Sequence, residues 1–189
     1  MSARIVALVG SLRAGSHNRQ LAEAAVDLAP EGATVEVYEG LADVPFYNED
    51  IDTEADLPQA AARLRAAVTD ADALLLFTPE YNGTMPAVLK NAIDWLSRPY
   101  GAGALRGKPV AVIGTAFGQY GGVWAQTEVR KAVGVAGGTV VEGVELAIPG
   151  SVTRFAETHP SEDAEVITGL SAVLTGLVTA TAAPAEATA

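Results

Sequence analysis

The sequence of 189 residues contains no cysteine and only two histidines, His17 and His159. The absence of cysteine excludes disulfides, iron–sulfur clusters, thiol chemistry and zinc sites built from thiolates. Two histidines that lie far apart in the chain do not suggest a site with several histidine ligands. The sequence therefore predicts no metal site.

Basic residues are scarce as well. Twelve lysines and arginines stand against 23 aspartates and glutamates, which gives a formal net charge of −11. Proteins that bind nucleic acids normally present a basic surface, so we expect no nucleic-acid partner. No lysine or arginine occurs between Arg19 and Arg63, and the acidic residues of that segment are typical of a solvated surface. Arg13 and Arg19 therefore stand out locally.

Long apolar runs are also missing. No run reaches the 18 residues that would indicate a transmembrane helix, although the hydrophobic fraction of 49% is sufficient for a core. The N-terminal residues lead directly into the short apolar run Ile5 to Val9, without the basic start, longer apolar region and cleavage site of a signal peptide. We expect a cytoplasmic protein with no membrane partner.

Short apolar runs alternate with segments of helical periodicity along the chain. Strands are expected over residues 5–9, 34–37, 73–77, 110–113 and 140–148, the last with a break near Gly143. The segments after these strands carry apolar residues three and four positions apart, as Leu21, Ala24, Ala25 and Leu28 do. This alternation predicts a parallel sheet with helices on both faces.

The second expected strand resembles an edge strand, because Val35 and Val37 alternate with polar residues. Five strands with such a second strand favour the order 2-1-3-4-5 in a three-layer α/β/α sandwich. In that order, ligands bind beyond the carboxyl ends of the strands near the switch point between strands 1 and 3. We therefore expect the loops after strands 1, 3 and 4 to carry the function. One domain over residues 1–181 and a frayed tail over 182–189 complete the prediction.

The loop after the first strand, Gly10 to Arg19, has the composition of a phosphate site. Ser11, Ser16 and Asn18 supply short donors, Arg13 supplies a permanent charge, and the following helix begins with free N–H groups. The loop matches neither the dinucleotide fingerprint nor the P-loop. The alternative is that Ser16 and Asn18 only cap the helix. We assign no catalytic role to His17, which lies in the same segment.

The loop after the third strand reads Thr-Pro-Glu-Tyr-Asn-Gly-Thr-Met-Pro from residue 78. Pro79 and Gly83 favour a rigid, tight backbone path, and Tyr81 offers an aromatic face. Such a loop presents main-chain groups to a planar ring with polar edges. The alternative is a turn followed by a helix that Thr84 caps, and this does not explain residues 80–82.

The loop after the fourth strand, residues 114–122, contains four glycines. Glycine allows the backbone to approach a ligand closely. The alternative is a flexible surface loop without a ligand.

Two motifs carry a resemblance to a known family. Gly-Ser-Leu-Arg-x-Gly-Ser-x-Asn, from residue 10, and Thr-Pro-Glu-Tyr-Asn-Gly, followed by Leu-Lys-Asn-Ala-Ile-Asp-Trp-Leu-Ser-Arg-Pro, resemble the NADPH-dependent FMN reductases. That family includes quinone, chromate and azo-dye reductases, and the resemblance covers roughly residues 3–180. It implies a flavodoxin-like fold, bound FMN, NADPH or NADH as co-substrate, and dimers or tetramers.

The resemblance also implies positions for the cofactor. The FMN phosphate would be held by Ser11, Arg13, Ser16 and Asn18, with His17 in the same segment. The flavin ring would be bordered by Pro79, Glu80, Tyr81, Asn82 and Gly83. Its remaining edge would be met by Thr115, Ala116 and Gly118.

By the same resemblance, a hydride would pass from the nicotinamide to the flavin and then to a small acceptor, namely a quinone, a free flavin, an azo compound or a metal oxyanion. The cofactor carries this chemistry, and no Ser/His/Asp set, pair of carboxylates or cysteine nucleophile can be assembled. We therefore predict no catalytic acid or base. An electron-transfer flavodoxin or an FMN sensor would share the fold, although the phosphate loop of flavodoxins usually lacks an arginine such as Arg13.

The tryptophans bear on assembly, because exposed tryptophans favour interfaces. Trp95 lies in the helix that follows residue 86, and Trp124 lies at the start of the next helix. We expect a homodimer or homotetramer, and the alternative places both tryptophans in the core of the monomer.

Overall fold

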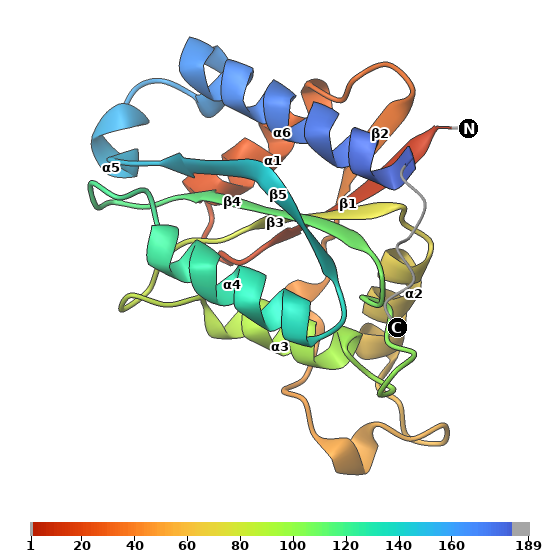
Figure 1. Ribbon diagram of the computed structural model, residues 1–189. Coiled ribbons are helices and arrows are strands. Elements are labelled where there is room, and N and C mark those ends of the chain that lie inside the picture. Colours follow the sequence, from red (N-terminus) through yellow and green to blue (C-terminus); the bar gives the residue numbers. More distant parts are fainter. Residues whose placement is uncertain (1, 183–189) are drawn as a thin grey trace.

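The computed structural model, which describes residues 2–182, has a parallel five-stranded sheet between two layers of helices (Figure 1). The strands run in the order β2-β1-β3-β4-β5, so the predicted flavodoxin-like sandwich and the edge position of the second strand are confirmed. Every residue of β3 is buried. The strands are β1 Ala3–Val9, β2 Ala33–Val37, β3 Ala73–Phe77, β4 Pro109–Thr115 and β5 Thr139–Ile148.

Each face of the sheet carries its own hydrophobic core. Alternate residues of a strand point to opposite faces, so Ile5 and Ala7 join one cluster while Val6 and Leu8 join the other. Helices α1 (His17–Asp27) and α6 (Ala164–Ala182) cover the first face. Helices α2 (Gln59–Thr69), α3 (Ala87–Leu96) and α4 (Val123–Val135) cover the second (Figure 1). The sequence did not predict four shorter elements, which are α5 (Ser151–Arg154) and the 3-10 turns Leu41–Asp43, Glu49–Ile51 and Pro160–Glu162.

Helix α6 is long and apolar enough to cross a membrane, judged by length and composition alone. In this fold its apolar stripe packs on the sheet, and Leu170, Leu174 and Leu177 are fully buried in the core. The helix continues through Ala182, and the other residues of the expected tail, 183–189, lie outside the described part of the chain.

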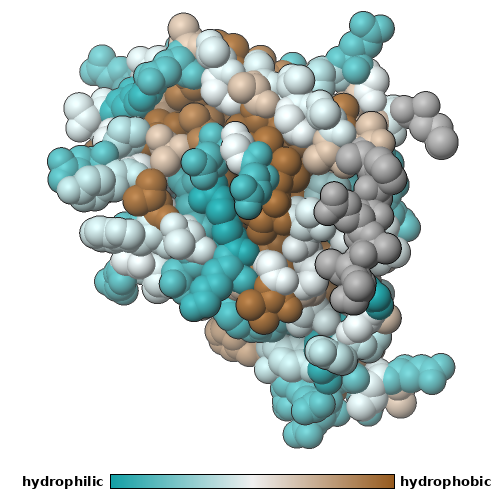
Figure 2. All heavy atoms as spheres, in the orientation of Figure 1, coloured by the Kyte–Doolittle hydropathy of each residue, from teal (hydrophilic) through white to brown (hydrophobic). Residues whose placement is uncertain are grey.

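The edge strand β5 contains a register shift and no break. Val110 pairs with Val140, and Val112 pairs with Glu145, so β5 holds extra residues around Gly143, whose φ is +72°. Figure 2 shows hydrophobic and hydrophilic residues next to each other on this face of the molecule, where β5 runs between α6 and α4. Strand β5 exposes Glu142 and Glu145 there. A bulge and charges are devices that discourage pairing with other chains at a sheet edge.

Trp95 belongs to the core, so its expected place at an interface is wrong. Its side chain is fully buried, and its indole N–H donates to the carbonyl of Pro45 at 2.7 Å. The guanidinium of Arg65 lies 5.2 Å from the Trp95 ring centroid and binds both oxygens of Asp52 at 2.7 and 2.8 Å. This arginine also holds the pKa of Asp52 below its usual value. The pair ties the acidic segment after β2 to α2 and closes it over Trp95. In contrast, Trp124 is 57% exposed.

Candidate cofactor-binding site

The loops after β1, β3 and β4 meet at the carboxyl end of the sheet. The N–H of Gly10 donates to Phe77 O at 2.8 Å, and the N–H of Thr78 donates to Ile113 O at 2.9 Å. A Cβ atom at Gly10 would lie 2.8 Å from Pro86 Cγ, so glycine is needed for this close approach. The predicted site residues are therefore gathered in one region.

The loop after β1 forms a cradle at the start of α1. Ser16 is the N-cap of the helix, and its hydroxyl accepts the Arg19 N–H at 3.4 Å. Within residues 2–182, the N–H groups of Gly15, His17 and Asn18 donate to no protein acceptor. These groups, with the positive end of the helix dipole, are available to an anion. Among the described residues, the exposed Arg13 guanidinium contacts only the Ala14 carbonyl, at 3.4 Å.

The side chain of Asn18 links the loops after β1 and β4. It is buried, its amide N–H donates to Thr115 O at 3.0 Å, and its amide oxygen accepts the Thr115 N–H at 3.0 Å. The Thr115 hydroxyl donates in turn to Ile148 O at 2.7 Å. The buried side chains of Asn18 and Thr115 therefore hold the loops after β1 and β4 together. Of their side-chain donors, only the second amide N–H of Asn18 has no protein partner in the described residues.

The His17 side chain packs against an aromatic ring and does not supply a positive charge to the loop. Its ring lies edge-on to Phe155 with 5.4 Å between the centroids. Burial and the nearby charge of Arg13 lower the pKa of His17. The imidazole is therefore neutral at neutral pH, and the positive charge in this loop comes from Arg13.

A tight turn shapes the loop after β3. Asn82 and Gly83 have φ values of +53° and +77°, and Tyr81 and Thr84 exchange two backbone hydrogen bonds of 3.1 Å. Two successive positive φ values define a type I′ turn, for which Asn-Gly is the strongest sequence signal. The alternative in which Thr84 caps α3 does not hold, because the Thr84 backbone closes this turn and Pro86 holds the N-cap position.

Glu80 connects the loop after β3 to α4. Its carboxylate accepts the N–H groups of Trp124 and Ala125 at 3.1 and 3.2 Å. The N-cap residue of α4 is Gly122, which has a φ of +82° and no side chain. Glu80 therefore supplies the missing cap and complements the helix dipole. No local pattern signals this role, because Glu80 and Trp124 lie 44 residues apart.

The loop after β4 is held in place by its own main chain. The Ala116 N–H donates to Ile148 O at 3.3 Å, and its carbonyl accepts the Ser151 N–H at 3.0 Å. The Gly118 carbonyl accepts the N–H groups of Gly121 and Gly150 at 3.3 and 3.2 Å. These bonds fix the loop at both ends and leave Phe117 between them exposed.

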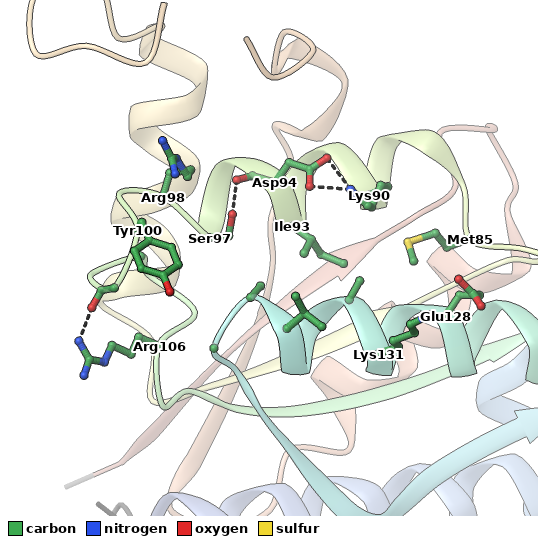
Figure 3. Close-up of a pocket in the computed structure, with 16 residues that line it drawn as sticks. Met85, Lys90, Ile93, Asp94, Ser97, Arg98, Tyr100, Arg106, Glu128 and Lys131 are labelled. Carbon is green, nitrogen blue, oxygen red and sulfur yellow. Dashed lines mark hydrogen bonds and ion pairs between the residues drawn. The ribbon is translucent and has the colours of Figure 1, made fainter. Parts of the chain in front are cut away.

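The surface carries two cavities, one beside these loops and one that runs from Met85 toward the amino ends of β4 and β5. One of about 430 Å³ borders the β1 loop and is lined by Ser11 and Arg13 as well as by the Arg19–Glu39 ion pair. The larger, of about 700 Å³, lies between α3 and α4 and includes the Lys90–Asp94 ion pair (Figure 3). None of the predicted site residues lines this larger groove. In a sheet of this order, ligands bind at the switch point, so the three loops remain the better cofactor site.

Known proteins resemble this chain in sequence and in fold. The family model described as NADPH-dependent FMN reductase matches residues 3–153. A 2-hydroxy-1,4-benzoquinone reductase from Burkholderia is 45% identical over 69% of this chain and 69% of its own length. A quinone reductase from Pseudomonas putida is 39% identical over 84% of each chain. The solved structure of a flavoenzyme NAD(P)H:(acceptor) oxidoreductase from Paracoccus denitrificans is 32% identical, with a TM-score of 0.83 over 95% of this chain and 97% of that one.

Proposed function

The chain belongs to the NADPH-dependent FMN reductase family, and from this we infer an NAD(P)H-dependent, FMN-containing oxidoreductase of the quinone reductase type. The family match over residues 3–153 carries this conclusion, because that span contains all three loops of the site. The reductases among its relatives act on a small-molecule acceptor. An electron-transfer flavodoxin or an FMN sensor is not favoured.

The β1 loop suits the phosphate of FMN. In the described part of the chain, the N–H groups of Gly15, His17 and Asn18 have no protein acceptor, and the Arg13 guanidinium contacts only the Ala14 carbonyl. These groups and the helix dipole favour a dianion. Ser11 and the Ser16 hydroxyl add short donors. Asn18 contributes mainly by holding the loop against Thr115.

The other two loops suit the flavin ring. Within the described residues, the N–H groups of Asn82, Gly83, Phe117 and Gly118 have no protein acceptor and so can meet the polar edge of a ring. Pro79, Tyr81 and Glu80 shape the β3 loop, and Thr115 and Ala116 fix the β4 loop. Bound FMN would supply the hydride and electron transfer. The residues of the chain bind and orient it, and no side chain is needed as an acid or base.

We expect the purified protein to be yellow or to take up about one FMN per chain. The measurement is an absorption spectrum after FMN is added and excess removed, followed by release and identification of the flavin. Release of FAD, or no uptake at micromolar FMN, would contradict the assignment. Steady oxidation of NADPH with a quinone acceptor separates a reductase from an electron carrier or a sensor, neither of which sustains turnover.

We also propose a homodimer or homotetramer in the cytoplasm. The groove between α3 and α4 supports this assembly, since Tyr100 and Val135 on its border are 91% and 85% exposed (Figure 3). Large exposed apolar side chains around a concave surface are typical of interfaces. Light scattering at working concentration measures the molar mass, and the mass of a single chain would contradict the proposal.

A further inference from the structure

Exposed aromatic side chains gather beside the candidate flavin site. Tyr81, Phe117, Tyr120 and Trp124 are 49%, 77%, 58% and 57% exposed. They come from the loops after β3 and β4 and from the first turn of α4. The whole chain has only two tryptophans, five tyrosines and four phenylalanines. Exposing large apolar rings to water is unfavourable, so four exposed aromatic side chains at one place indicate a binding surface.

The structure fixes these rings in position. Tyr120 and Trp124 pack with 5.9 Å between ring centroids and an interplanar angle of 42°. The Trp124 backbone N–H donates to the Glu80 carboxylate, and a Cβ atom at Gly83 would lie 3.8 Å from the Trp124 ring. The Tyr81 hydroxyl lies 3.5 Å from Ser11 Oγ, within the β1 loop. The aromatic surface is therefore continuous with the loops that we assign to FMN.

The chemistry of this surface favours one kind of acceptor. Aromatic rings bind other flat rings by offset or edge-to-face stacking. Within residues 2–182, neither the Trp124 indole N–H nor the Tyr120 hydroxyl has a protein partner, so both can donate to oxygen atoms on the edge of a ring. The net charge of −11 opposes the approach of anions.

We propose that Trp124 and Tyr120 select the electron acceptor, favouring flat apolar ring systems with carbonyl oxygens over small hydrated anions. Glu80 is a positioning residue that sets the Trp124 ring by capping α4. This inference rests on the proposed FMN site and adds the residues that discriminate between acceptors.

The test compares two acceptors, menadione and ferricyanide, in the FMN-loaded protein with saturating NADPH. Trp124→Ala should lower the ratio of kcat/KM for menadione over ferricyanide about tenfold, since one aromatic contact has about this worth. Trp124→Phe should keep most of the ratio. Phe46→Ala, which removes a ring that is 78% exposed outside the three loops, is the matched control and should keep the wild-type ratio.

Glu80 provides a second arm of the experiment. Glu80→Ala removes the cap and should lower the same ratio, while Glu80→Gln keeps an acceptor oxygen and should restore most of it. A ratio within twofold of wild type in Trp124→Ala, in protein that binds FMN and oxidises NADPH, overturns the inference and leaves the proposed function intact. Absence of FMN uptake in the wild-type protein overturns both. A lowered ratio accompanied by a changed molar mass assigns Trp124 to a subunit contact and also overturns it.

Discussion

Replacing Gly114 with alanine should destabilise the protein by about 3 kcal/mol, at the upper end of what overpacking costs. Gly114 is buried in β4, and a Cβ atom there would lie 2.1 Å from Thr78 O and 3.1 Å from Thr78 C. These are backbone atoms at the end of β3, so no side chain can rotate away. Relief requires β3 and β4 to separate where the Thr78 N–H donates to Ile113 O. The same movement disturbs Asn18, whose Oδ1 would be 3.3 Å from the new atom.

Thermal unfolding followed by circular dichroism measures this effect. For a domain of this size, we expect a Tm lower by about 10 °C. Gly118→Ala is the matched control, because Gly118 lies four residues further along the chain, in the loop after β4, and a Cβ atom there meets nothing within 4 Å. Equal Tm values for the two variants would show that β3 and β4 can move apart to admit the methyl group at little cost in stability. A low Tm for Gly118→Ala alone would assign the strain to the loop after β4.

The sequence was sufficient for the architecture because apolar runs and turn residues are local signals. The buried strand β3 reads as an unbroken apolar run, and β2 reads as an alternating one, which matches their central and edge positions. Once the strand order follows, parallel strands must place their carboxyl ends together. The grouping of the three loops was therefore predictable before any side-chain contact was known.

The partners of individual polar side chains were not predictable in this way. Asn18 was expected to donate to a phosphate, yet both ends of its amide bind Thr115, 97 residues away. Glu80 was expected to border a flavin ring, and the contact that its carboxylate makes with α4 was not foreseen. In each case several acceptors are chemically equivalent, and tertiary packing decides which of them lies within reach.

Trp95 shows the same limit for an apolar residue. Its position three residues after Ala92 placed it near the apolar face of α3, and this spacing was the available signal for burial. What completes the burial is the segment after β2, which supplies the Pro45 carbonyl and Asp52. That acidic, irregular segment has no periodicity from which its path over Trp95 could be predicted.

Replacing Arg13 with alanine should weaken FMN binding by about 10- to 100-fold while the apo protein keeps its stability. A charge-assisted hydrogen bond contributes about 1.5–3 kcal/mol, which corresponds to this range of affinity. Arg13 is exposed, and its one hydrogen bond to residues 2–182 is the long 3.4 Å contact to Ala14 O, so little packing is lost. Fluorescence titration with FMN gives the affinity, and thermal unfolding without FMN gives the stability. Arg13→Lys keeps the charge without the planar guanidinium, so its FMN affinity should lie between those of the wild type and Arg13→Ala.

Arg4→Ala separates a local contact from a change in net charge. Arg4 lies near the start of β1, about 20 Å from the loop at the other end of this strand. Its removal changes the net charge by the same amount as Arg13→Ala but should change FMN affinity by less than about twofold, because solvent and salt screen charges at that distance. Equal losses of affinity in the two variants would mean that Arg13 acts only through the overall charge. A collapse of apo stability in Arg13→Ala with unchanged affinity would instead make Arg13 a structural residue of the loop.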